Sequence, residues 1–312
     1  MGTLIGDLIS YYRIERKVSQ EELAEGICSR RQIINIEQGA NFPNLELLSV
    51  LSSKLNVNLF ESYSNVYRQN TLSAHLKCMK INAGLTELNI DALEELYKEY
   101  ENDPDFIKGE PHQILLYAKA IVKARNGKER EAIRYSMDGI KETLPQYPDW
   151  SAIGDQLSNI EIALLLSYSV YLCRIGKAEE GLTNFEEIEK RVDKLLHISL
   201  YEGDSKKSMW INTWCNCVYN EYSFGNYDEK VMLEKIDKVL DYQKENKRSY
   251  MITELLLCKA AILMNMGDVH KALAAYKMSE QFELFFSDRE MFLNKAKLIM
   301  SLHSDLSLFE TT

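Results

Sequence analysis

The stretch from Val18 to Leu48 constrains the fold most, because it contains two short helical patterns with marked ends. Ser19 is a good N-cap for the first helix, and Glu22 three residues later completes a capping box. Ser29 caps the second helix, and Gly39 ends it. Two short capped helices with a tight connection predict a helix-turn-helix, whose second helix enters the major groove of DNA.

Polar side chains open the second of these helices. Arginine pairs bidentately with guanine, and glutamine or asparagine pairs with adenine. A solvated helix face is the alternative interpretation, but the surrounding motif favours contact with bases or phosphates. The candidate DNA contacts are Arg30, Arg31, Gln32 and Asn35, with Ser29 as a phosphate contact in addition to its capping role.

The composition is that of an ordinary soluble protein with room for two domains. Hydrophobic residues make up 46% of the 312 residues, and charged residues make up 27%. No apolar run approaches the roughly 20 residues that span a bilayer. Asp7 and Arg13 interrupt the apolar residues at the N-terminus, so we expect no cleavable signal. Six cysteines without a framework spacing indicate a reducing cytosol, so we expect a cytoplasmic protein with no membrane partner.

The net charge of −10 at first argues against nucleic acid as a partner. Residues 1–68, however, carry seven basic and eight acidic side chains, so most of the negative charge belongs to the rest of the chain. The N-terminal part is still not basic overall. Its non-specific affinity for DNA should therefore be weak and strongly limited by salt.

The chain has only five prolines and fourteen glycines among long amphipathic stretches, which predicts an all-α fold. The N-terminal part should contain five helices. Besides the two in the helix-turn-helix, we expect helices over residues 2–16, over 45–55 and from about 59 onward. Residues 69–111 are interpreted as a connecting region with one clear helix at 91–100.

A repeated turn pattern follows the connecting region. Four glycines, each between two amphipathic helical patterns, are spaced by 49, 49 and 42 residues: Gly127, Gly176, Gly225 and Gly267. Three of them have a small residue five positions later (Ala132, Gly181 and Ala272), whereas the fourth has Lys230. This is the turn of a tetratricopeptide (TPR) repeat, lengthened from the usual ~34 residues. We therefore predict a TPR-like right-handed helical superhelix.

Three asparagines form a stripe on the predicted helix before Gly225. Asn212, Asn216 and Asn220 recur every four residues, and the first two fall on the concave face of the TPR pattern, with Tyr219 nearby. An amide side chain carries both a donor and an acceptor, which suits an extended peptide backbone. Bonds to the local backbone are the alternative. The candidate peptide-binding residues are these four, with Ser167 and Glu254 at matching positions on neighbouring repeats.

No pattern in the chain indicates catalysis or metal binding. Cys215 and Cys217 have no second pair and no histidine at zinc spacing. The five histidines are isolated, and neither a phosphate-binding glycine loop nor a nucleophile elbow is present. We therefore expect no metal, no cofactor and no enzymatic activity, and we assign Trp214 to the core.

The N-terminal part resembles the phage-repressor, lambda-repressor-like or Xre-like, class of DNA-binding domains. The resemblance is carried by S-Q-E-E-L-A at 19–24, I-E-Q-G at 36–39, and N-F-P-N-L-E-L-L followed by L-N-V over 41–57. It implies a phosphate contact for Gln20 and base reading by Arg30, Arg31 and Asn35. The chain departs from the class in a turn one residue shorter and in an apolar Ile34.

Such a head on a degenerate TPR superhelix resembles the Rgg/PlcR/PrgX group of Gram-positive regulators. The segments E-G-I-C-S-R-R and I-E-Q-G-A-N-F-P are especially similar to that group. The resemblance implies a cytosolic homodimeric transcription factor that binds a short imported signalling peptide on its concave TPR surface. We predict a DNA-binding domain at 1–66 and a sensing and dimerisation domain at 67–312. We also expect an inverted-repeat DNA site, with RNA polymerase as a further candidate partner.

A second class of function stays open on the sequence. The TPR-like part would then be a protein-interaction module, and the helix-turn-helix head would act as a constitutive repressor or a partner-regulated factor. A TPR groove that clamps a carboxylate needs converging lysines and arginines, and the helix with Asn212 offers none, which disfavours one version of this alternative.

Overall fold

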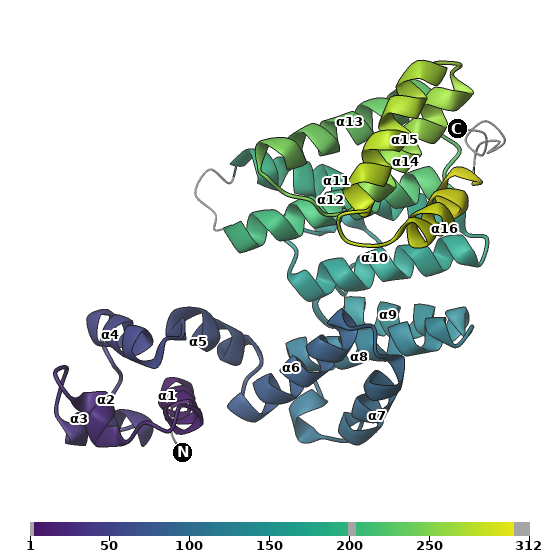
Figure 1. Cartoon of the computed structure of the whole chain (residues 1–312). Coiled ribbons are helices and arrows are strands. Elements are labelled where there is room, and N and C mark those ends of the chain that lie inside the picture. The colour runs from purple at the N-terminus through teal and green to yellow at the C-terminus, as the bar shows by residue number, and fades with distance from the viewer. Residues whose placement is uncertain (1–2, 199–203, 303–312) are drawn as a thin grey trace. The chain divides into compact units, whose positions relative to one another are not determined.

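The computed structural model describes residues 3–198 and 204–302, and every regular element in those ranges is a helix. This confirms the predicted all-α fold (Figure 1). The chain divides into two compact units. Unit 1 comprises residues 1–128 with 141–143, and unit 2 comprises residues 129–140 with 144–312. The boundary at residue 66 between a head and a sensor stays a prediction.

Unit 1 begins with five helices around one apolar core. They are α1 (Leu4–Glu15), α2 (Gln20–Ala24), α3 (Arg30–Glu37), α4 (Leu45–Leu55) and α5 (Leu59–Arg68). The capping box of Ser19 and Glu22 forms as predicted, and Ser29 caps α3. Helix α2 has only five residues, because Glu25 leaves the helical backbone with a ψ of 124°. The first helix is also shorter than predicted, because Thr3 caps it.

Helices α1 and α3 cross at very close range. A Cβ atom added at Gly6 of α1 would overlap the backbone carbonyl oxygen of Ile36 on α3. The side chains of Leu8, Ile9 and Ile33 are fully buried in the core that these helices share with α2, α4 and α5. The second helix of the helix-turn-helix is thus fixed against α1 by backbone contact as well as by apolar packing.

Three further helices complete unit 1: α6 (Leu72–Thr86), α7 (Ile90–Tyr100) and α8 (Gly109–Arg125), with a short 3-10 turn at Pro104–Phe106. The prediction of a single helix within 69–111 was wrong, because α6 also forms in this region. The buried face of α6 includes His75 and Gly84 beside Cys78 and Ile81. Small and polar side chains on a buried face weaken the apolar periodicity by which such a helix is found.

Polar contacts tie the end of α5 to the helices that follow. The Gln69 side-chain amide donates to the Glu110 carboxylate on α8 at 2.8 Å, and Arg68 forms an ion pair with the same carboxylate at 3.1 Å. Gln69 is also hydrogen-bonded to the buried His75 of α6 at 2.8 Å. These contacts place the five-helix head and α6 to α8 in one unit.

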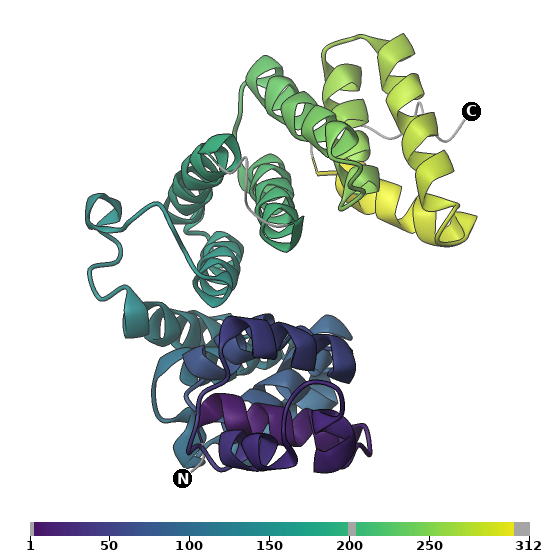
Figure 2. The same ribbon diagram turned by 90° about the vertical axis from the view of Figure 1, so that its left-hand side faces the viewer.

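Unit 2 is built from helices in two layers. Its helices are α9 (Glu129–Thr143, whose last residues belong to unit 1), α10 (Asn159–Arg174), α11 (Ala178–Ile198), α12 (Asp204–Phe224), α13 (Glu229–Glu245), α14 (Ile252–Asn265), α15 (Val269–Glu283) and α16 (Arg289–Met300). Helices α10, α12, α14 and α16 each contact the next in that series, and α11, α13 and α15 pack beside them (Figure 2). This arrangement places α12, with the asparagine stripe, between α10 and α14.

The four predicted turn glycines each lie between consecutive helices of the chain, as the repeat pattern required. Gly181 shows why a small residue is needed five positions after a turn. A Cβ atom there would lie 2.7 Å from the Ser169 carbonyl oxygen of α10. Ala132 and Ala272 are fully buried at the equivalent positions, whereas Lys230 is exposed.

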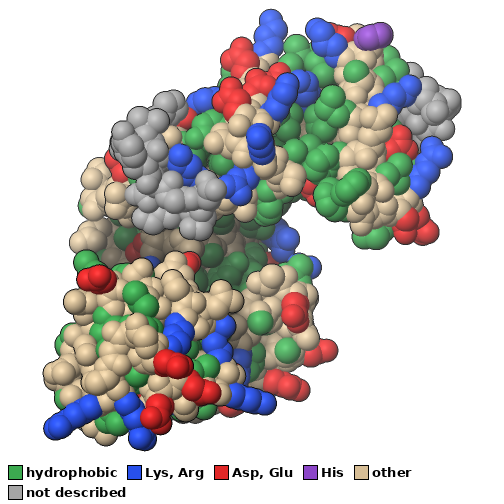
Figure 3. Space-filling view, turned by 60° about the vertical axis from the view of Figure 1, so that its left-hand side comes forward, with side chains coloured by type: hydrophobic (Ala, Val, Ile, Leu, Met, Phe, Trp, Pro, Cys, Tyr) green, Lys and Arg blue, Asp and Glu red, His purple; other side chains and the backbone are tan. Residues whose placement is uncertain are grey.

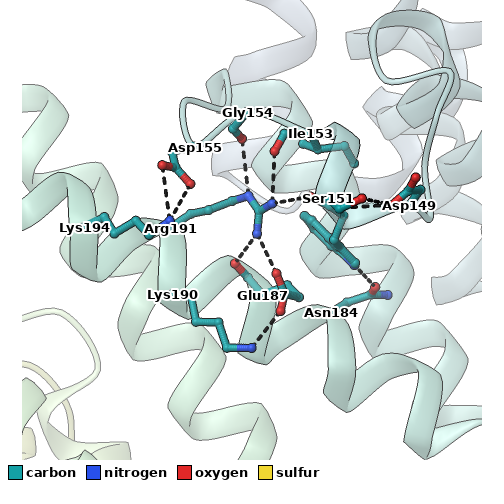
Figure 4. A network of polar contacts seen from close by, with 11 residues as sticks. Asp149, Ser151, Ile153, Gly154, Asp155, Asn184, Glu187, Lys190, Arg191 and Lys194 are labelled. Atoms are coloured by element: carbon teal, nitrogen blue, oxygen red, sulfur yellow. Dashed lines mark hydrogen bonds and ion pairs between the residues drawn. The ribbon is translucent and has the colours of Figure 1, made fainter.

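Side chains of α11, above all Arg191, hold the long connection between α9 and α10 (Figure 4). The Arg191 guanidinium donates to three backbone carbonyl oxygens, those of Trp150 at 2.8 Å, Ile153 at 3.1 Å and Gly154 at 3.3 Å. Its guanidinium carbon also lies 4.6 Å from the centre of the Trp150 ring. The connection, which includes the 3-10 turn Trp150–Ala152, is therefore fixed to α11 by charge-assisted hydrogen bonds.

A buried charge cluster joins α12 to α11 and α13. Lys235 of α13 donates to Glu189 of α11 at 2.7 Å and to Glu221 of α12 at 2.6 Å. The Trp214 indole donates to Glu189 at 3.0 Å, and its side chain is buried as predicted. Burial, together with the neighbouring Glu189 charge, raises the pKa of Glu221 to about 7 in spite of the opposing effect of Lys235.

This cluster predicts a pH-dependent stability of unit 2. Between the ordinary glutamate pKa and about 7, the folded chain keeps a proton on Glu221 that the unfolded chain has lost. The stabilisation of the folded state by this retained proton is therefore complete at low pH and is lost as the pH rises to about 7. We expect Glu221→Gln, which mimics the protonated form, to be more stable than the parent at pH 8 and similar to it at pH 5. Thermal unfolding across this range measures the difference.

The exposed Glu234→Gln on α13 is the matched control for that experiment. It should follow the parent at every pH. Equal slopes of melting temperature against pH for the parent and Glu221→Gln would contradict the assignment.

Candidate nucleic-acid interface and ligand cavity

Helix α3, the second of the helix-turn-helix, exposes a polar face to solvent. Ile33 and Ile36 of α3 point into the core and are buried. The predicted DNA contacts Arg30, Arg31 and Gln32 are exposed, and Asn35 is half-buried. Ser29 accepts a hydrogen bond from the Gln32 backbone N–H at 3.2 Å and is itself exposed. Ser29, Arg30, Arg31 and Gln32 thus lie at the N-terminal end of α3, and Asn35 lies more than one turn further along the helix.

Most of the head's basic side chains are already bonded to the protein. Arg13 pairs with the Glu37 carboxylate, and Arg68 pairs with the Glu110 carboxylate. Arg16 donates to the Asn56 carbonyl oxygen, and Lys54 donates to the Glu25 carbonyl oxygen. Across the described residues, Arg30, Arg31 and Lys17 have no such bond. Figure 3 shows Lys and Arg side chains projecting at the lower end of unit 1 among Asp and Glu. Arg30 and Arg31 therefore place two basic side chains without a protein partner at the start of α3.

Gln20 takes part in a network that joins the first three helices. The Arg13 guanidinium of α1 pairs with the Glu37 carboxylate of α3 through two nitrogens, at 2.6 and 3.0 Å. The Gln20 side-chain amide of α2 donates to the same carboxylate at 2.7 Å. The amide nitrogen of Gln20 is thus occupied. A phosphate contact by this residue would use its backbone N–H, which lies at the first position of α2.

The asparagine stripe of α12 is partly bonded to its own helix. The Asn216 amide nitrogen donates to the Asn212 carbonyl oxygen at 2.8 Å and to the Tyr250 hydroxyl at 3.1 Å. The Asn220 amide nitrogen donates to the Asn216 carbonyl oxygen at 2.7 Å. Among the described residues, the Asn212 side chain has no hydrogen-bond partner. The amide nitrogens of Asn216 and Asn220 therefore bond to the local backbone, which was the alternative interpretation. Their side-chain oxygens take no part in these bonds.

A cavity of about 510 Å³ opens beside this stripe, entirely within unit 2. It lies between the N-terminal part of α12, the start of α14 and the end of α15. The stripe residue Asn212 and the predicted Glu254 both line it. The other lining residues are Ser208, Arg248, Ser249, Tyr250, Met251, Ile252, Thr253, Phe282, Glu283 and Phe286.

The remaining predicted peptide contacts lie outside the cavity. Asn216 reaches it through Tyr250, whereas Asn220 does not line it. Tyr219 is half-buried, and burial raises its pKa. The Ser167 hydroxyl on α10 donates to the Ala163 carbonyl oxygen at 2.7 Å. The structure therefore joins two of the six predicted residues in the cavity and a third at its edge.

A lysine of α16 pairs with both carboxylates at the cavity. Lys295 pairs with Glu254 at 2.9 Å and with Glu283 at 2.9 Å. Burial opposes ionisation of Glu283, but hydrogen bonds from Lys295 and Thr253 outweigh it and hold the pKa of this carboxyl below its usual value. Glu254 and Glu283 thus share one cation as their partner.

Several lining residues were not found by sequence reasoning. Ser208 lies four residues before Asn212, so the spacing of the stripe could have revealed it. Tyr250 and Met251 lie in the connection from α13 to α14, where Met251 has a left-handed backbone with a φ of +55°. No local pattern marks these residues, nor Phe282 and Phe286, because the fold alone brings them to α12.

Comparisons with known proteins agree with this geometry. Residues 9–62 match the helix-turn-helix family model, and no curated protein matches the chain. Bacillus thuringiensis PlcR, solved with the peptide PapR7 and DNA, is 14% identical with a TM-score of 0.59 over 93% of this chain and 99% of that one. The Streptococcus dysgalactiae pheromone receptor Rgg2 is 16% identical with a TM-score of 0.51, over 95% and 99% of the two chains.

ComR of S. thermophilus, solved with DNA and its signalling peptide, is 18% identical with a TM-score of 0.50 over 95% of this chain and 98% of that one. The chain has the fold of these regulators. This confirms the predicted helix-turn-helix head followed by TPR-like helices.

Within the described ranges, no helix is both long enough and apolar enough to cross a membrane.

The Glu37 network predicts a specific weakness of the head. Glu37→Gln leaves the Arg13 guanidinium largely buried without its charged partner. Breaking such a pair lowers the free energy of unfolding of the head by about 3 kcal/mol. Amide exchange through opening of the head should then be roughly a hundredfold faster. Hydrogen exchange of α1 to α3, followed by mass spectrometry, measures this. The exposed Glu25→Gln should exchange like the parent, and parental protection in Glu37→Gln would show that the pair does not hold the head.

Proposed function

We propose that this chain is a DNA-binding transcription regulator whose unit 2 binds a short signalling peptide. The observation that carries the proposal is the pairing of two sites in one chain. A helix-turn-helix presents unbonded arginines at the start of α3, and a separate unit has a cavity lined by Asn212, with Asn216 bonded to the lining residue Tyr250. The fold shared with PlcR and ComR supports it, because those proteins were solved with both DNA and peptide.

The DNA site is proposed from the exposed edge of α3. Arg30, Arg31, Gln32 and Asn35 read bases, and Ser29 with the start of α2 at Gln20 contacts phosphates. One such helix covers only a few base pairs, so a homodimer on an inverted repeat provides the specificity. The proposal makes the chain a cytoplasmic regulator and assigns it no enzymatic step.

The peptide site is proposed along α12. Asn212, Asn216 and Asn220 supply carbonyl oxygens that accept from peptide N–H groups, and Asn212 also donates. Tyr219, Ser167 and Glu254 lie on the same layer of helices, where they flank the path. A peptide acts on transcription only if it binds one arrangement of the dimer better than another, so binding and DNA affinity are coupled.

The DNA proposal predicts different effects for two kinds of basic residue. Arg30→Ala and Arg31→Ala should each weaken binding to a DNA site selected from random sequence by about 1–3 kcal/mol, while binding to scrambled DNA changes less. Lys17→Gln removes the same charge outside α3 and should leave the ratio of specific to scrambled affinity unchanged. Fluorescence anisotropy at one salt concentration measures both. An unchanged ratio in both arginine variants would remove α3 from base reading.

The peptide proposal predicts a loss of peptide affinity when the stripe is broken. Asn216→Ala removes a peptide acceptor and should cost roughly 1–3 kcal/mol, which is about a five- to 150-fold loss in affinity. Asn246→Ala is the matched control, because this residue caps the C-terminal end of α13, its amide makes the same type of bond to the Tyr242 carbonyl, and it does not line the cavity. Calorimetric titration with a peptide recovered from the protein gives both values. Equal affinities in the two variants would exclude Asn216 from the site.

A further inference from the structure

One apolar side chain of α3 lies outside the core of the head. Ile33 and Ile36 are 0% and 1% exposed, whereas Ile34 is only half-buried. Among the described residues of the head, Ile34 belongs neither to the buried core nor to the half-buried apolar side chains that pack against that core. The packing of the five helices therefore does not account for an isoleucine at this position.

The position of Ile34 along the helix places it on the side of α3 that carries the arginines. Residues three and four apart are neighbours on the surface of an α-helix, and Ile34 follows Arg31 by three residues and Arg30 by four. It is one residue from Ile33, so it is turned by about 100° from that buried side chain. Ile34 thus borders the exposed, charged side chains that are proposed to read bases.

An isoleucine side chain can recognise only one feature of the major groove. It has no hydrogen-bond donor or acceptor, so it cannot pair with the polar edges of the bases. The apolar group that the bases present in this groove is the C5-methyl group of thymine, and contact with it removes apolar surface from water. Cytosine presents an amino donor on that edge, which would lose water beneath an isoleucine without gaining a partner. Ile34 therefore favours thymine over cytosine.

We propose that Ile34 is a specificity-determining residue that contacts the methyl group of one thymine in each half-site of the DNA. This inference rests on the proposed DNA-binding function. Arg30 and Arg31 recognise guanine through charge-assisted hydrogen bonds, and Ile34, one turn further along the helix, adds recognition of a thymine by apolar contact. The two kinds of contact are thus assigned to neighbouring positions on one side of α3.

Replacement of thymine by uracil tests this contact, because the two bases differ only in the C5-methyl group. The full-length protein first selects a site from random duplex DNA. Each thymine of that site, on either strand, is then replaced in turn by deoxyuridine, and both affinities are measured by fluorescence anisotropy at one salt concentration. We expect one position in each half-site at which the replacement weakens binding about fourfold, which corresponds to the loss of one buried methyl group.

Variants of two isoleucines assign the contact to its residue. Ile34→Ala should bring the ratio of thymine to uracil affinity at that position close to one, and Ile34→Val should keep most of the parental ratio. Both affinities come from one preparation, so partial unfolding of a variant lowers them equally and leaves the ratio unchanged. Ile14→Ala is the matched control, because Ile14 is 60% exposed on α1 and should give the parental ratio when it is changed.

The possible results separate this inference from the function on which it rests. A selected site in which no thymine is sensitive to the loss of its methyl group would overturn the inference and leave DNA binding in place. A parental ratio in Ile34→Ala would also overturn it, because another group would then contact the methyl. Failure of the protein to select any DNA would instead overturn the proposed function.

Discussion

The contact of Arg13 and Gln20 with the Glu37 carboxylate is the interaction on which the proposed DNA interface depends. It joins α1, α2 and α3 through one largely buried group, whose side chain is 7% exposed. The close approach of Gly6 to Ile36 fixes two of these helices, α1 and α3, against each other. Because α3 has only eight residues, its orientation comes from these contacts rather than from its own helical stability. Arg30 and Arg31 are thereby presented as a fixed pair.

Unit 2 uses the two sides of α12 for different purposes. Trp214 and Glu221 face α11 and α13, where Lys235 and Glu189 close a buried polar cluster. Asn212 and Asn216 face the cavity and Tyr250 instead. A helix held firmly on one side can keep its opposite side in a binding-competent geometry, which lowers the entropic cost of binding. The buried cluster and the proposed peptide site are linked in this way through one helix.

Sequence reasoning predicted the features that depend on local chemistry. The Ser19 capping box, the Ser29 cap and the turn glycines are local, and each was found in the structure. The helix α6 was missed because its buried face includes His75 and Gly84, so its pattern is not apolar. Of the residues that line the cavity, Asn212 and Glu254 were predicted and Ser208 could have been found from the spacing of the stripe, whereas Phe282 and Phe286 lie about 70 positions further along the chain. The bond from Gln20 to Glu37 likewise connects residues whose proximity no local pattern encodes.

The central claim is that one chain joins a DNA-reading head to a peptide receptor. Its most direct test is to purify the full-length protein from its native cells, release bound material by denaturation and identify it by tandem mass spectrometry. The account predicts a single short peptide, close to one per chain. Recovery of DNA-binding-competent protein with no peptide, or with an intact protein partner in its place, would contradict it.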